Sequence, residues 1–150
     1  MKGNATIPKK IAVLMGGPSA EREVSLATGR GISKALRSLG ADVVDVDVRN
    51  AKFELPRDVE FAFIALHGTF GEDGQVQALL ERAGVPYTGS DVPASQLAIS
   101  KSATKVRLLQ RGVPTAPYAL IHESDSAHHI LQHAQRLGFP LVVKPDTQGS

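Results

Sequence analysis

The chain has 150 residues, 42% of them hydrophobic and 21% charged, which are the proportions of an ordinary globular protein and exclude a disordered or membrane-embedded class. Seventeen Lys+Arg against fifteen Asp+Glu leave a net charge of +2, and the basic residues are scattered, so we expect no nucleic-acid or membrane partner. Cysteine is absent, which excludes disulfides and thiolate chemistry. Without a secretory h-region or a membrane-spanning apolar run, a cytoplasmic protein is expected.

The first hundred residues alternate between strand and helix patterns. Apolar runs or alternation predict strands at residues 10–15, 42–48 and 61–66, the first and last buried on both faces. Helical spacing predicts helices over residues 24–39 and 76–83, ended by Gly40 and Gly84, with a short extended segment at 85–90. This order predicts a parallel sheet covered by helices. We therefore expect an α/β, Rossmann-like domain over residues 1–100.

The pattern changes near residue 100, and we expect a domain boundary between Ile99 and Lys101. Prolines mark the passage and predict breaks at Pro86, Pro93, Pro114 and Pro117. Helices are predicted over residues 100–112 and 125–138, and strands over 116–121 and 139–145. In the second helix we expect an inward apolar face made of Ala127, Ile130, Leu131, Ala134 and Leu137.

The stretch GGPSAEREVS, residues 16–25, lies between a predicted strand and a predicted helix, where open α/β sheets bind ligands. It lacks the later glycines of a G-x-G-x-x-G fingerprint, so a dinucleotide site is weakly supported. Glu21 and Glu23 have two interpretations. They could complement the helix dipole, which their spacing alone favours, or one could hold a cationic group such as a substrate ammonium.

The stretch HGTFGEDG, residues 67–74, is the denser group of polar residues. His67 follows a predicted strand at its carboxyl end, so we expect it to face the same sheet edge as Glu21. Asp73 is predicted to be the N-cap of the next helix.

Three lysines are candidate phosphate ligands: Lys101, Lys105 and Lys144. For Lys105 a solvated helix face is the stronger interpretation. Lys144 ends a predicted strand and precedes a loop with Gly149 and Ser150, which is the arrangement expected of a nucleotide phosphate site, although it is not a Walker motif.

His129 and His133 share a helical face at the i, i+4 spacing, which can hold zinc. No H-E-x-x-H pattern or third ligand accompanies them, so a solvated face is expected and no metal site is predicted within the chain. No serine elbow or Ser-His-Asp order supports covalent hydrolysis.

Five stretches, in this order and spacing, resemble the amino-terminal part of the D-alanine–D-alanine ligases, which are ATP-grasp enzymes. They are GGPSAEREVSLATG, HGTFGEDGQVQALLE, GVPYTGSDVPAS, ISKSATKVRLLQRGVPTAPY and PLVVKPDTQGS. The resemblance implies an ATP-dependent ligase that joins two D-alanines through an acylphosphate for peptidoglycan synthesis. It implies that residues 101–150 begin an α+β ATP-grasp domain, and that the protein is a cytoplasmic homodimer.

The resemblance also implies roles for individual residues. Glu21 matches the glutamate that binds the ammonium of the first D-alanine, which overturns the dipole interpretation, and His67 matches a histidine of the same pocket. Lys101 and Lys144 match two lysines that contact ATP phosphates. Gly149 and Ser150 match the loop that closes over the site, with Ser150 among the catalytic residues. The ligands of Mg²⁺ or Mn²⁺ are expected beyond residue 150, so the chain by itself is expected to be incomplete and inactive.

Two other functions stay open. The chain could be a non-catalytic, Rossmann-like module that binds a small molecule, or an ATP-grasp ligase for another amino or hydroxy acid. Residues 112–150 are expected to expose apolar surface and to show little protection from hydrogen exchange.

Overall fold

The computed structural model describes residues 10–148. The contacts between residues divide this part of the chain into two compact units. The first unit contains residues 10–99 together with Gln148, and the second is Ser100–Thr147. All the paired strands among the described residues belong to the first unit.

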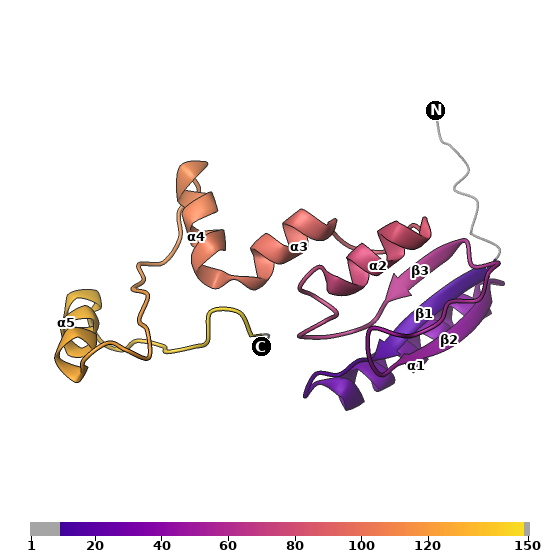
Figure 1. Cartoon of the computed structure of the whole chain (residues 1–150), viewed down its shortest axis with the longest axis horizontal. Coiled ribbons are helices and arrows are strands. Elements are labelled where there is room, and N and C mark those ends of the chain that lie inside the picture. Colours follow the sequence, from indigo (N-terminus) through magenta and orange to yellow (C-terminus); the bar gives the residue numbers. More distant parts are fainter. Residues whose placement is uncertain (1–9, 149–150) are drawn as a thin grey trace. The chain divides into compact units, whose positions relative to one another are not determined.

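A parallel sheet forms the centre of the first unit, and its three named strands have the order β2-β1-β3 among the described residues (Figure 1). They are β1 (Lys10–Gly16), β2 (Asp42–Val48) and β3 (Phe61–Ile64). Lys10 lies opposite Asp42, and Ile11 lies opposite Phe61. The predicted extended segment contributes one parallel bridge, between Tyr87 and Ala62. The predicted α/β class with a parallel sheet is therefore confirmed.

Helices cover both faces of this sheet, as Figure 1 shows: α1 (Arg22–Ser38) lies on one face and α2 (Gln75–Ala83) on the other. Alternate residues of β1 pack on the two faces of the sheet. Val13 and Met15 pack with Leu26, Ile32 and Leu36 of α1. Ala12 and Leu14 pack in the cluster that contains Val76 and Leu80 of α2. The expected burial of the first strand on both faces is confirmed.

Small residues let α1 lie close to β1. Ser25, Gly29 and Ser33 are the buried residues of the helix. A Cβ added at Gly29 would lie 2.5 Å from the Met15 Cβ, so this helix approaches the strand more closely than an alanine would allow. Two large apolar residues face solvent instead: Val24 of the helix is 58% exposed, and Leu39, which follows the helix, is 67% exposed.

The sequence pattern did not predict α3 (Val92–Ile99), because a proline such as Pro93 predicts a break. The structure places Pro93 in the first turn, where a proline's missing N–H is one that the helix would leave unpaired anyway. Asp91 precedes the helix and accepts a hydrogen bond from the Ala94 amide at 3.0 Å. An aspartate followed closely by proline is therefore a start signal here.

The second unit contains both predicted helices, α4 (Lys101–Gln110) and α5 (Ala127–Leu137). Each is capped by a serine: Ser100 Oγ accepts from the Ala103 amide and Ser126 Oγ from the His129 amide, both at 3.2 Å. These N-caps satisfy amides that the first helical turn leaves without a backbone partner.

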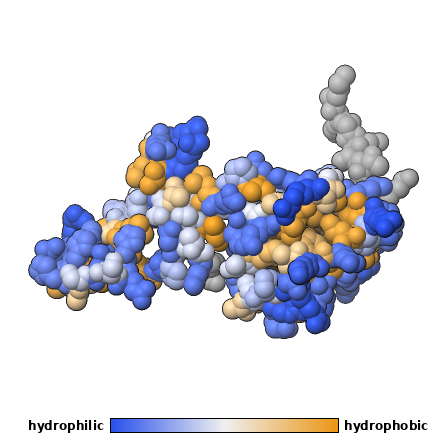
Figure 2. Space-filling model, viewed as in Figure 1, coloured by the Kyte–Doolittle hydropathy of each residue, from blue (hydrophilic) through white to orange (hydrophobic). Residues whose placement is uncertain are grey.

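The two strands predicted in this unit are wrong: residues 116–121 and 139–145 form no strand. A strand needs a neighbouring backbone to pair with, and none is present within the described part of this unit. The expected inward face of α5 is also wrong, because no residue of this helix is buried and there is no sheet in its unit to cover it. The expected exposure of apolar surface is confirmed, since Val142 and Val143 are 78% and 73% exposed. Figure 2 shows hydrophobic atoms, coloured orange, at the surface of the molecule.

Candidate functional site

The first candidate residue, Glu21, occupies the N-cap position of α1. The chain reaches it by a turn after β1, in which Gly16 and Gly17 have φ of 90° and 88°, a region that other residues rarely adopt. The Glu21 side chain does not cap the helix, although its carbonyl accepts the Ser25 amide at 3.0 Å. Its carboxylate is therefore not committed to the helix backbone.

Glu21 and His67 meet where β1 and β3 end, through Ser19. The Ser19 hydroxyl donates to the His67 carbonyl at 2.8 Å and accepts the Glu21 amide at 3.2 Å. A Cβ at Gly68 would lie 2.6 Å from Glu21 Oε2, so the carboxylate lies directly against the backbone that follows His67. The structure thus brings together two residues that are far apart in the sequence.

The His67 ring is one-third exposed and lies between two polar side chains. Its Nε2 is 3.4 Å from Thr28 Oγ1, and its Nδ1 is 3.8 Å from Glu72 Oε1. The second distance is too long for a hydrogen bond. A carboxylate beside Nδ1 nevertheless favours a proton on that nitrogen, which leaves the Nε2 lone pair toward the Thr28 hydroxyl.

Ser25 holds the two strand ends at a fixed separation. Its fully buried hydroxyl accepts the Gly16 amide at 2.9 Å and donates to the Ala65 carbonyl at 2.7 Å. Both backbone groups lie in the core, where an unpaired polar group is costly. The side chain therefore replaces the strand pairing that would otherwise satisfy them.

Asp73 is not the N-cap of α2; Gly74 is, with φ of 91°. The prediction failed because the aspartate is one residue too early, yet its carboxylate still accepts the Gln75 amide at 3.1 Å. It also accepts the Phe70 amide at 2.9 Å. Phe70 is a non-glycine residue at φ 75°, and its ring is buried against Phe53. Asp73 therefore fixes the turn that carries His67.

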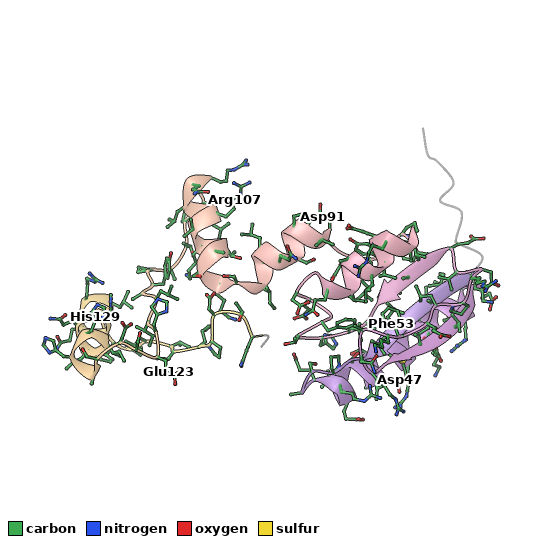
Figure 3. The ribbon with its side chains drawn as sticks, in the orientation of Figure 1. Asp47, Phe53, Asp91, Arg107, Glu123 and His129 are labelled. Carbon is green, nitrogen blue, oxygen red and sulfur yellow. The ribbon has the colours of Figure 1, made fainter. Side chains whose placement is uncertain are left out.

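An arginine–aspartate group lies at the end of β2 (Figure 3 labels Asp47). Arg22 is 2.8 Å from the Asp47 carboxylate and also donates to the Val48 carbonyl, and Arg49 contacts the same carboxylate at 3.2 Å. The hydrogen bond from Arg22, ahead of the one from Arg49, lowers the pKa of Asp47. Gly17, Pro18, Arg22 and Arg49 line an open depression of about 430 Å³, and neither Glu21 nor His67 lines it.

Lys101 and Lys144 belong to one local structure in the second unit, centred on Asp146. The Asp146 carboxylate accepts the Ser102 amide at 2.7 Å and the Ser100 hydroxyl at 2.8 Å, and these bonds lower its pKa. The Asp146 carbonyl accepts the Lys101 amide at 3.0 Å and the Lys101 ammonium at 3.4 Å. Lys144 precedes Asp146 by two residues and is exposed. The start of α4 and the chain around Lys144 are therefore tied together.

Lys105 differs from its sequence interpretation as part of a solvated face. Its ammonium donates to Thr115 Oγ1 at 3.0 Å and to the Ala116 carbonyl at 2.9 Å, and lies 5.3 Å from the centre of the Tyr118 ring. This lysine therefore fastens the chain after α4 to the helix, a tertiary role that helical spacing could not reveal. Gly149 and Ser150 lie outside the described residues.

Sequence reasoning missed the short hydroxyl side chains that build this site: Ser19, Ser25 and Thr28. Each contacts a residue 39 to 48 positions away. A signal was available, because serine just after a buried strand, in or before the first helical turn, can reach the neighbouring strand end. The local sequence pattern did not indicate which distant group the serine hydroxyl would bond to.

Comparison with known proteins shows which proteins the chain is similar to. A profile of the D-ala D-ala ligase N-terminus matches residues 41–90. The D-alanine–D-alanine ligases of Methylacidiphilum infernorum and Syntrophotalea carbinolica are 44% and 53% identical over 98% and 95% of the chain. The chain matches the amino-terminal part of the D-alanine–D-alanine ligases. It spans about half the length of these relatives, 46% in both cases.

A solved ligase structure is also similar to this chain. The D-alanine–D-alanine ligase of Bacillus anthracis, complexed with ATP, superposes with a TM-score of 0.79 at 36% identity, over 93% of this chain and 48% of that one. In the part of the chain that the structure describes, no helix has the length and apolar character to cross a membrane.

Proposed function

We propose that this sequence supplies the amino-terminal part of an ATP-dependent ligase that joins two D-alanines for peptidoglycan synthesis. The named relatives support the reaction, and one structural observation supports the site. A carboxylate, Glu21, lies against the Gly68 backbone beside His67, at the carboxyl edge of a parallel sheet. That edge is the usual position of a ligand in an open α/β fold.

In this proposal Glu21 binds the ammonium of the first D-alanine and so directs its carboxylate toward the nucleotide. A charge-assisted hydrogen bond of this kind is short and directional, which makes it a positioning contact. His67 lines the same pocket, and its Nε2 lone pair can accept a hydrogen bond. Ser19 bonds to the backbone of both residues, so they are held near each other before the substrate arrives.

The lysines of the second unit would complement the negative charge of ATP. Lys101 and Lys144 would hold its phosphates with mobile ammonium groups. ATP would supply the phosphoryl group that activates the D-alanine carboxylate. Lys144 is exposed, so its side chain could turn toward an anion, and the Lys101 ammonium lies 3.4 Å from the Asp146 carbonyl in the same local structure. Gly149 and Ser150 would belong to the closing loop, and Mg²⁺ or Mn²⁺ would be held by groups that follow them.

Residues 1–100 would be the substrate-binding domain and residues 101–150 the start of the ATP-grasp domain. We further propose a cytoplasmic homodimer, without a nucleic-acid or membrane partner. Sedimentation equilibrium measures the assembly directly, and a mass of one chain at all concentrations would contradict the dimer.

The test of the site is D-alanine binding by the 150-residue chain. Binding is measured through the amide chemical shifts in NMR, because this method detects weak binding. We expect D-alanine, but not L-alanine, to shift the amides of residues 16–21 and 67–74. Glu21→Gln should abolish these shifts. Glu23→Gln is the matched control, since Glu23 is an exposed carboxylate in the first turn of the same helix.

Equal shifts in the Glu21→Gln variant would overturn the assigned site. A coupled ADP-release assay with D-alanine and magnesium tests the remainder, and the chain alone should show no turnover. Tight binding of a nicotinamide cofactor would instead favour the non-catalytic Rossmann-like module. Preference for another amino or hydroxy acid would favour a related ligase.

A further inference from the structure

Two histidines on the surface of α5 have their ring nitrogens within reach of one ion. His129 Nε2 and His133 Nε2 are 3.1 Å apart, and the two rings are tilted by 55° with centres 4.5 Å apart (Figure 3 labels His129). Two nitrogens that bind one metal ion at about 2.0–2.1 Å lie roughly 2.8–3.4 Å apart for angles between square and tetrahedral. The observed separation falls inside this range.

A carboxylate orients the first of these rings. Asp125 Oδ1 is 3.4 Å from His129 Nδ1, one helical turn earlier. A carboxylate accepts only, so it favours the proton on Nδ1 and leaves the Nε2 lone pair available. Metal-binding histidines commonly have such a partner on the other nitrogen. Asp125 is itself held by the His122 amide, which donates to its other oxygen at 2.8 Å.

An arginine favours the opposite tautomer in the second ring, that of His133. The Arg136 guanidinium is 2.6 Å from His133 Nδ1 and can only donate, so this nitrogen carries the lone pair and Nε2 carries the proton. The proton on His133 Nε2 then points at the His129 Nε2 lone pair. Binding an ion to both Nε2 atoms requires the proton of His133 to leave that nitrogen and the contact with Arg136 to break.

We propose that His129 and His133 form a two-imidazole site for a divalent late transition-metal ion, such as Ni²⁺ or Cu²⁺, and that Arg136 opposes its occupation. Imidazole is a preferred ligand of these ions, and Cu²⁺ and Ni²⁺ bind nitrogen sites strongly among first-row divalent metals. The described residues contain no group of three or more potential ligands, so water would complete the coordination. None of these three residues is among the proposed ligase residues.

The test is a calorimetric titration of the untagged chain with Ni²⁺, because a polyhistidine tag would itself bind the ion. One ion should bind, and His129→Gln or His133→Gln should weaken binding by roughly tenfold or more. His128→Gln is the matched control: His128 is also an exposed histidine of α5, but its partner is Gln132. This variant should bind as the parent does. Circular dichroism checks that the helix is kept.

Two further variants test the flanking residues. Asp125→Asn should weaken binding, because the amide holds the His129 tautomer less firmly. Arg136→Gln should strengthen binding, because the competing hydrogen bond and a positive charge are removed. Absence of binding, or equal loss in His128→Gln, would overturn the site. Unchanged binding in Arg136→Gln would overturn the opposing role of Arg136.

Discussion

The Ser19 hydroxyl donates a 2.8 Å hydrogen bond to the His67 carbonyl while it accepts the Glu21 amide. One small side chain therefore determines the distance between the two residues proposed to bind D-alanine. The turn after β1 and the turn after β3 are joined at this point, and the position of the Glu21 carboxylate against Gly68 depends on it.

Ser19→Ala should reduce the free energy of unfolding by about 1–2 kcal/mol. The substitution removes the hydroxyl that is the hydrogen-bond partner of two partly buried backbone groups. It should also weaken the D-alanine-dependent shifts. Urea denaturation followed by circular dichroism measures the first effect. Ser38→Ala is the control, since that exposed hydroxyl makes only a local bond to the Ala35 carbonyl. A larger loss in the control would contradict the role of Ser19.

Ser25 and Ser33 are both fully buried in α1, but only Ser25 has hydrogen-bond partners. Ser25→Ala leaves the Gly16 amide and the Ala65 carbonyl without it, so the free energy of unfolding should fall by about 2–4 kcal/mol. Ser33→Ala removes a buried hydroxyl that has no partner and should be neutral or stabilising by up to about 1 kcal/mol. Chemical denaturation compares the two, and equal losses would refute the distinction.

Gly29 and Gly31 lie in the same helix and should respond in opposite directions to alanine. The new Cβ at Gly29 would lie 2.5 Å from Met15 Cβ, whereas the one at Gly31 would have nothing within 4 Å. We expect Gly29→Ala to destabilise by about 1–3 kcal/mol through overpacking. Gly31→Ala should stabilise by up to about 1 kcal/mol, since alanine is the better helix former. Thermal unfolding midpoints would show the opposite signs, and a shift of the same sign in both would count against the tight contact.

The start of α4 should be sensitive to acid because the pKa of Asp146 is lowered by the Ser102 amide and the Ser100 hydroxyl. A lowered pKa in the folded state means that this stabilisation is fully present above the ordinary value of 3.8 and is lost as pH falls through the lower, folded value. The Ser102 amide shift in NMR should therefore be constant from neutral pH down to about pH 5 and should change below about pH 4. In Asp146→Asn this acid transition should vanish; its persistence would assign it to another group.

Backbone amides of residues 112–148 should exchange with solvent much faster than those of residues 11–66. The first group includes α5, which has no buried residue, whereas β1 is buried along almost its whole length. Exchange of a group with few buried contacts proceeds through local opening. Hydrogen–deuterium exchange followed by mass spectrometry reports both segments in one experiment, and equal protection would contradict the expectation.

The local sequence pattern was sufficient to predict the helices and strands that are defined by their own residues. The apolar run of β1, the alternation of β2 and the glycine stops after α1 and α2 predicted these elements to within about two residues. The same reasoning failed for the strands expected at residues 116–121 and 139–145, since a strand exists only when another backbone pairs with it. Local pattern also did not predict α3, because Pro93 by itself predicts a break and only the Asp91 hydrogen bond to the Ala94 amide shows that a helix starts there.

The sequence by itself determined the class of fold, the order of the elements and the identity of the polar residues at the ends of β1 and β3. Apolar periodicity and turn residues act over a few positions, and their physical cause is local. Only the tertiary structure decided that Ser19 and Ser25 bond to residues 48 and 40 positions away and so join two strand ends, and that α1 approaches β1 through Gly29. Those contacts depend on which distant groups folding brings within hydrogen-bond or van der Waals distance, and this information is not contained in any short stretch of the chain.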